Sequence, residues 1–243
     1  MVAFDGARRR LVITAGAAGP GLLLVSGSAG LALAAGRDHR KGQEKEVGAV
    51  EDLMREHGVL RRALLVYIEC VPKIRANPAN VSAESWARTA KLFRAFGEDY
   101  HERRLEEPYI FPAVKKAGGQ AADYIDVLKA QHDRGREVTD YILSVTGKGT
   151  LSDDSELLAR ALETFVLMYQ NHTAREDTIV FPAWKEVLST RQLHEMGDRF
   201  EDIERQQFGK DGYDDAVAQI GQIEQLLGLA DVAQFTAPPP PKT

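Results

Sequence analysis

Residues 100–114 read YHERRLEEPYIFPAV and residues 171–184 read NHTAREDTIVFPAW, so one unusual pattern occurs twice in the chain. In each stretch a histidine is followed by charged residues, an acidic pair, a short apolar patch and then Phe-Pro-Ala. The two acidic pairs are as far apart along the chain as the two Phe-Pro pairs. The repetition indicates that two segments of the fold end in the same way.

Apolar residues recur at steps of three and four in four segments, which predicts four long amphipathic helices. The first segment carries Leu53, Leu60 and Leu64, and it is expected to end at Pro72 and the turn that follows. Because the connections are short, each helix is expected to run antiparallel to the next. The sequence therefore predicts an all-α fold, an up-down-up-down four-helix bundle over residues 47–190.

The other helix ends follow from capping and turn residues. Ser82 is expected to cap the second helix, which closes at the glycine pair 118–119. The third helix is expected to end at TGKGT, residues 146–150, and Ser-Asp-Asp at 152–154 to cap the fourth. The second and fourth helices run parallel in such a bundle, so the repeated endings are expected at the same end.

Three polar or mixed segments flank the predicted bundle. Residues 37–46 form a polar linker, and residues 191–230 carry two shorter helical patterns that predict a C-terminal helical extension. Residues 231–243 form a proline-rich tail for which no regular structure is expected.

The first 36 residues have a different composition. Arginines at 8–10 precede an uncharged apolar run that ends near the small-residue sequence Ala32-Leu33-Ala34, as in a secretory signal peptide. The arginine run resembles a twin-arginine signal, which exports folded proteins. We therefore expect a periplasmic or extracellular protein. A leader retained as a membrane anchor, and a misassigned start codon in a cytoplasmic protein, are the alternatives.

The composition limits the classes of function. A net charge of −5 gives no basic field for nucleic acid or an anionic membrane, so neither partner is expected unless the leader is retained as an anchor. The single cysteine, Cys70, excludes an intrachain disulfide and a cysteine-based zinc cluster. Cys70 lies beside an apolar run and is expected to be a small buried core residue.

Of the six histidines, one falls on each predicted helix of the bundle: His57, His101, His132 and His172. Burying four unpaired imidazoles with nearby carboxylates is unfavourable, and metal ions remove that penalty by giving each lone pair a partner. Imidazole and carboxylate without thiolate favour iron, manganese or zinc, and two carboxylates able to bridge favour two ions. His39 and His194 are expected at the surface.

The spacing of histidine and glutamate differs between the two repeated stretches. His172 and Glu176 are four residues apart, so both can face the bundle axis. His101 and Glu106 are five apart, and in a regular helix Leu105 would take the inward position instead. The second helix therefore needs an irregularity if it is to present a matching carboxylate.

Proline provides a cause for that irregularity. Pro108 cannot donate to the carbonyl of Arg104, which permits a π-type widening between these two residues. Such a widening would turn Glu106 back toward the histidines. Glu102 and Asp177, each close to a histidine, are alternative or additional ligands.

Around the four histidines the chain resembles the hemerythrin-like (HHE cation-binding) family. The resemblance covers roughly residues 47–190 and rests on REHGVLRR, YHERRLEEPYIFP, QHDRGREVTDYI and NHTAREDTIVFP. The later helices resemble a C-terminal extension of some bacterial members. The resemblance implies a non-haem centre of two Fe ions held by His57, His101, Glu106, His132, His172 and Glu176.

One position departs from the oxygen carriers of that family. They have a second histidine four residues after the one on the third helix, and this chain has Arg136 there. Four histidines instead of five argue against simple reversible oxygen carriage.

The resemblance implies binding, sensing or detoxification of a small oxidant, namely dioxygen, peroxide or nitric oxide. Storage or delivery of iron or another cation, and a structural bundle without metal, are the alternatives. The sequence does not choose between carrier, sensor and enzyme, and it leaves the oligomeric state open.

Export can be tested through the arginine run. Replacing the three arginines at 8–10 by lysine should retain the protein in the cytoplasm with its metal already bound, because this pathway carries folded cargo. Cell fractionation with metal analysis measures this. An unaltered protein found in the cytoplasm alone, with its amino terminus intact, would contradict export.

Overall fold

The computed structural model describes residues 47–78, 82–147 and 155–241. The predicted leader and linker, residues 1–46, and the predicted cap of the fourth helix at 152–154 lie outside the described residues. Every regular element in the described part is helical and none is a strand, which confirms the all-α prediction. Within the same part, no helix is both long enough and apolar enough to cross a bilayer.

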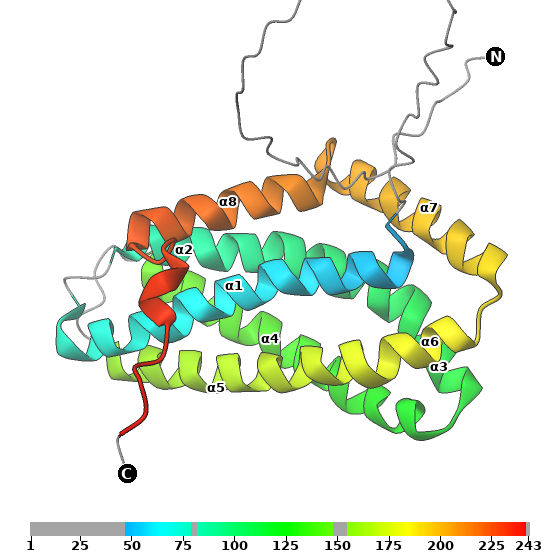
Figure 1. The fold of residues 1–243 in the computed structure, drawn as a ribbon, viewed down its shortest axis with the longest axis horizontal. Helices are drawn as coiled ribbons and strands as arrows, with labels where there is room; N and C mark the ends of the chain where they lie inside the picture. The colour runs from blue at the N-terminus through cyan, green and yellow to red at the C-terminus, as the bar shows by residue number, and fades with distance from the viewer. Residues whose placement is uncertain (1–46, 79–81, 148–154, 242–243) are drawn as a thin grey trace, which may run out of the picture. The chain divides into compact units, whose positions relative to one another are not determined.

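Four long helical segments make up the main body, and three of them contain or follow a change of helix type (Figure 1). The first segment is α1 (Ala49–Ala76). The second runs through α2 (Ala83–Leu92), the π-helix η2 (Phe93–Ile110) and α3 (Phe111–Ala117). The third is a 3₁₀ turn, η3 (Gln120–Tyr124), leading into α4 (Ile125–Thr146). The fourth runs through α5 (Ser155–Arg175), the π turn η4 (Glu176–Val180) and α6 (Phe181–Glu186).

The helix ends follow the predicted capping except at Pro72. The Ser82 hydroxyl accepts the backbone N–H of Ser85 at 3.2 Å and caps α2, as predicted. Pro72 does not end α1 but lies inside it, and the helix ends at Ala76, where the predicted turn begins. Proline removes one backbone hydrogen bond, whereas the buried residues on either side, Val71 and Ile74, keep the last turn packed on the core.

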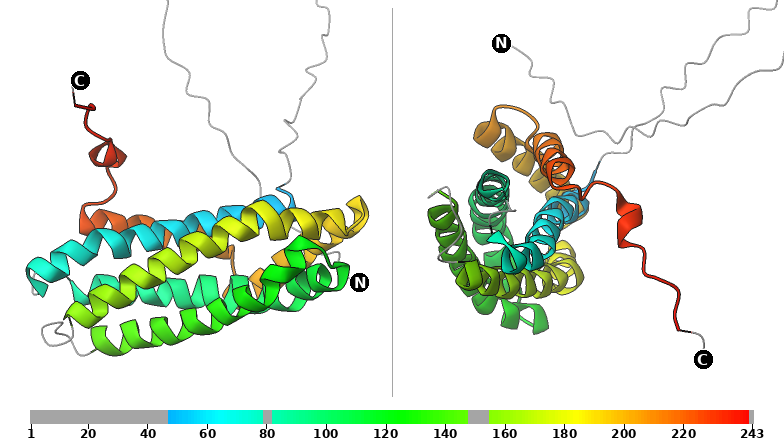
Figure 2. Two further views of the ribbon diagram at one scale, coloured as in Figure 1. Left: turned by 90° about the horizontal axis from the view of Figure 1, so that it is seen from below. Right: turned by 90° about the vertical axis from the view of Figure 1, so that its left-hand side faces the viewer.

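The four segments pack around one hydrophobic core (Figures 1 and 2). α1 lies against α5 and η2, while α4 lies against α5, α2 and η2. This packing is consistent with the predicted up-down-up-down order. Cys70 is fully buried, as expected, and burial raises the pKa of its thiol. The largest buried side chains are aromatic: Trp86, Trp184, Tyr67, Tyr100, Tyr169, Phe93, Phe96, Phe165 and Phe181.

Two further helices, α7 (Thr190–Phe208) and α8 (Gly212–Leu227), fall where the sequence beyond Ser189 shows its two shorter helical patterns. They cover α1 and the α2–η2 segment, and Phe208 of α7 packs edge-to-face against Tyr100 with 5.2 Å between the ring centroids. The proline-rich tail begins with a 3₁₀ turn, η5 (Val232–Phe235), which the composition did not predict.

The π-helical backbone is more extensive than the sequence predicts. The widening expected between Arg104 and Pro108 extends over all of η2, and η4 is a second π segment that was not expected. Each ends where a phenylalanine N–H bonds to the carbonyl five residues back, of Glu106 in η2 and of Glu176 in η4. A proline follows each phenylalanine, and its ring would clash with the carbonyl four residues back in a regular helix. The widened turn relieves that clash.

Two glycines make a matched test of the packing. A Cβ at Gly135 of α4 would lie 2.0 Å from the Tyr169 hydroxyl, whereas one at Gly58 of α1 would meet no atom within 4 Å. Gly135→Ala should therefore destabilise the fold by about 1–3 kcal/mol through overpacking. Gly58→Ala should stabilise it by about 0.5–1 kcal/mol. Denaturant unfolding measures both, and equal effects would contradict this packing.

Candidate metal centre

The four predicted histidines meet in the core as two pairs. In the first histidine pair, Nε2 of His57 lies 3.0 Å from Nε2 of His101. In the second histidine pair, Nε2 of His132 lies 3.1 Å from Nε2 of His172. Each imidazole is at most 2% exposed. One histidine comes from each of the four long helical segments, so the centre requires all four to be assembled.

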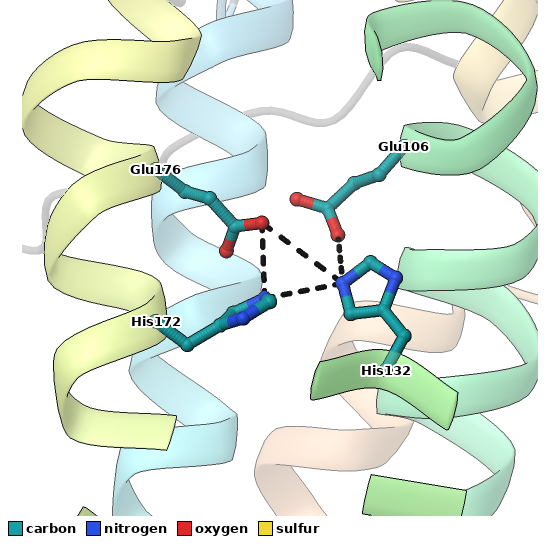
Figure 3. Close-up of side chains that lie close together, drawn as sticks. All are labelled: Glu106, His132, His172 and Glu176. Carbon is teal, nitrogen blue, oxygen red and sulfur yellow. Dashed lines mark hydrogen bonds and ion pairs between the residues drawn. The ribbon is translucent and has the colours of Figure 1, made fainter. Parts of the chain in front are cut away.

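Two carboxylates reach from one pair to the other. Glu106 places Oε1 3.3 Å from Nε2 of His101 and Oε2 3.3 Å from Nε2 of His132. Glu176 places Oε2 3.5 Å from Nε2 of His57 in the first pair and Oε1 3.0 Å from Nε2 of His172 in the second pair. Figure 3 shows both carboxylates directed at the second pair. Each carboxylate therefore approaches both histidine pairs.

The irregular second segment presents Glu106 as predicted. Within η2 the five-residue spacing from His101 to Glu106 brings both side chains into the centre. Leu105 is also buried, but it belongs to the hydrophobic core. The π-helical backbone thus compensates for the extra residue, because its hydrogen bonds span five residues.

The two central carboxylates lack hydrogen bonds. All four oxygens of Glu106 and Glu176 are buried without a hydrogen-bond partner. A buried carboxylate with no such partner is strongly unfavourable unless a cation compensates it. In the described residues three groups of candidate ligand atoms lie within 4.8 Å of one another: Glu106 and Glu176 with the second pair, Glu106 with the first pair, and Glu102 and Glu107 with His132. The buried histidines and carboxylates are therefore compatible with metal binding.

The pKa values of these carboxyl groups and of His132 are also strongly shifted by burial and by neighbouring charges. Burial raises the pKa of Glu176, and repulsion from the Glu106 carboxylate raises it further. Burial also opposes the ionised form of Glu106, but His101 and His132 outweigh this and hold its pKa well below the usual range. Burial opposes the charge on His132, yet surrounding carboxylates raise its pKa to about 10. Metal ions at these ligands would compete with protons, so metal binding would depend on pH.

On its outer side every imidazole is held by an acceptor from a neighbouring helix. A carboxylate or amide oxygen accepts from each Nδ1, which fixes the proton there and turns the Nε2 lone pair inward. Two facing Nε2 lone pairs then need a proton or a metal ion between them. The contacts are His57 to Asp177 at 2.7 Å, His101 to Glu56 at 2.6 Å, His132 to Glu107 at 3.1 Å and His172 to Gln131 at 3.0 Å.

Sequence reasoning did not anticipate Glu56, Glu107 and Gln131 as acceptors. Asp177, which the sequence offers as an alternative or additional ligand, bonds the outer nitrogen of His57 and pairs with Arg61. A shared feature could have pointed to them: each acceptor directly adjoins a candidate ligand along the chain. Glu56, Glu107, Gln131 and Asp177 adjoin His57, Glu106, His132 and Glu176.

Glu102, the other alternative ligand, lies 4.0 Å from Nδ1 of His132 and forms with Glu107 and this histidine a further group that could hold a metal ion. Its oxygens accept from the Tyr169 hydroxyl at 2.8 Å and from Arg136 at 3.3 Å. Arg136 pairs with Glu107 as well, so its guanidinium neutralises the carboxylates beside His132 and does not enter the centre.

Two phenylalanines of the repeated ending cover the centre. Phe111 stacks on the ring of His132 at 5.2 Å between centroids, and Phe181 stacks on the ring of His57 at 5.3 Å. Both phenylalanines are at most 3% exposed, so they exclude water from one face of each imidazole.

The family model of the hemerythrin HHE cation binding domain matches residues 48–184. The chain belongs to the hemerythrin HHE cation-binding family. It is 39% identical over 236 residues to uncharacterized proteins of Mycobacterium bovis and Mycobacterium tuberculosis, covering 95% of this chain and 91% of each relative. No solved structure matches the chain. The matched HHE region contains all six candidate ligands.

Ligand and surface histidines of this HHE protein can be separated by mutation. His132→Ala and His172→Ala should each lose bound metal and lower the Tm, by roughly 2–4 °C for each kcal/mol lost. His194 is exposed on α7, so His194→Ala should keep both metal and Tm. Metal analysis and thermal unfolding measure these effects. Metal loss in His194→Ala would show that the assignment is wrong.

Proposed function

We propose that this chain is a non-haem di-iron protein that binds a small oxidant, namely dioxygen, peroxide or nitric oxide, and senses it or removes it. The observation that carries the proposal is the set of four buried carboxylate oxygens, each without a hydrogen bond and directed at a histidine pair. Membership of a cation-binding family supports a metal at this place.

The donor set supports two ions and favours iron. Each ion would receive two imidazole nitrogens and one oxygen from each of Glu106 and Glu176. Imidazole and carboxylate ligands without thiolate suit iron, and carboxylates that bridge two ions are typical of di-iron bundles. Bound iron would supply redox chemistry and coordination positions left open by the protein. The proposal includes an up-down-up-down order of the four long segments.

The residues of the chain provide the surroundings that such chemistry needs. The four Nδ1 contacts orient the imidazoles, and the stacked rings of Phe111 and Phe181 exclude water. Six candidate ligands enclosed in a core suit a fixed number of metal ions. This favours binding of a small oxidant at the centre over storage of a variable number of cations. Export after folding would allow the metal to be selected in the cytoplasm, and it remains part of the proposal.

Metal content and the visible spectrum test the proposal. Protein purified under iron-replete conditions should contain about two irons per chain and show oxo-bridged ferric absorption that changes with peroxide or nitric oxide. Glu106→Ala and Glu176→Ala should each lose the bridged spectrum, because each removes a carboxylate that spans both positions. A ratio near one iron per chain, or a clear preference for zinc in competition, would contradict the di-iron assignment.

A further inference from the structure

The outer supports of the four histidines are not equivalent. His57, His101 and His132 each donate to a carboxylate, whereas His172 donates to the amide oxygen of Gln131. A carboxylate makes the imidazole a more basic and stronger metal ligand through its charge, and a neutral amide does so less. One imidazole of the second pair therefore lacks the support that both imidazoles of the first pair have.

Cations lie beside carboxylates of both pairs. Glu107 behind His132 is shared by Arg136 and Lys129, and Asp177 behind His57 pairs with Arg61. In the first pair, Glu56 behind His101 is buried and also accepts the Tyr100 hydroxyl. Two carboxylates thus stand behind the first pair and one behind the second, so the first pair has more carboxylates to stabilise a divalent cation.

A pocket also brings solvent close to the second pair. It has a volume of about 170 Å³ and lies between α4 and α5, where Tyr124, Val127, Leu128, Gln131, Asn171 and Arg175 line it. Gln131 therefore faces the pocket and also holds the outer nitrogen of His172. Its amide connects the pocket with the second pair.

We propose that the two metal positions of this chain are unequal, that the position held by His132 and His172 is the weaker and exchangeable one, and that Gln131 is the positioning residue that sets the difference. The proposal rests on the proposed function only in requiring two metal ions. It concerns affinity and exchange, so it does not depend on the metal's being iron or on any oxidant.

Metal release tests the proposal directly. Full-length protein is loaded with Fe²⁺ without oxygen, or with Zn²⁺, and release to excess chelator is followed over time. The wild type should release its two ions in a fast and a slow phase of equal amplitude. Gln131→Glu gives His172 a carboxylate, and it should slow the fast phase about 10–100-fold, the usual effect of an outer-shell partner.

Two further variants complete the design. Asn171→Asp adds the same charge to the same pocket, but the side chain of Asn171 hydrogen-bonds Leu167 and Arg175 rather than an imidazole, so both phases should stay unchanged. Glu56→Gln gives His101 an amide partner and should accelerate the slow phase. Helix content by circular dichroism checks that each variant folds.

The outcomes separate the two proposals. A single release phase in the wild type, or equal effects of Gln131→Glu and Asn171→Asp, would overturn the inequality. Two phases for Zn²⁺ in a protein that binds no oxidant would support the inequality and reject the oxidant function. A protein that binds at most one ion would reject both.

Discussion

The four Nδ1 hydrogen bonds form a closed cycle around the bundle. Glu56 of α1 holds the histidine of η2, Glu107 of η2 holds that of α4, Gln131 of α4 holds that of α5, and Asp177 of η4 holds that of α1. Each contact fixes the rotation and height of one helix against the next within the tolerance of a hydrogen bond. Because each acceptor adjoins a ligand, the position of the ligands on one helix also sets their position on the next.

The sequence predicted features that are set within one helix, such as caps and buried stripes. It did not predict contacts that depend on how two helices are packed together. The stripes carrying His57 and His132, the cap at Ser82 and the inward turn of Glu106 follow from local spacing, and the structure agrees. Whether Gln131 reaches a histidine of α5 depends on how α4 and α5 are rotated against each other, which no local pattern gives. The helix end predicted at Pro72 was wrong for a related reason: the packing of its neighbours on the core outweighs one lost backbone hydrogen bond.

Arg136 is no candidate ligand, but its guanidinium pairs with two carboxylates beside the second histidine pair. A histidine at this position would add an imidazole near the second pair, whereas the longer arginine pairs with Glu102 and Glu107 on the outer side. Both carboxylates are thereby compensated, and Glu107 remains available to His132. Arginine at this position supplies no nitrogen ligand, and it keeps Glu102 and Glu107 paired, as a buried cluster of charges requires.

The repeated Phe-Pro ending joins backbone shape to the chemistry of the centre. In η2 the N–H of Phe111 bonds to the carbonyl of Glu106, and the ring of Phe111 stacks on His132 of α4. In η4 the N–H of Phe181 bonds to the carbonyl of Glu176, and its ring stacks on a histidine of α1. The proline after each phenylalanine favours the wide turn, and the five-residue bond then ties the bridging carboxylate to the residue that shields an imidazole. One motif thus directs a carboxylate from its own segment into the centre and places a cover on a histidine of a neighbouring segment. Two buried carboxylates on two different segments need two such motifs, which accounts for the repeated ending.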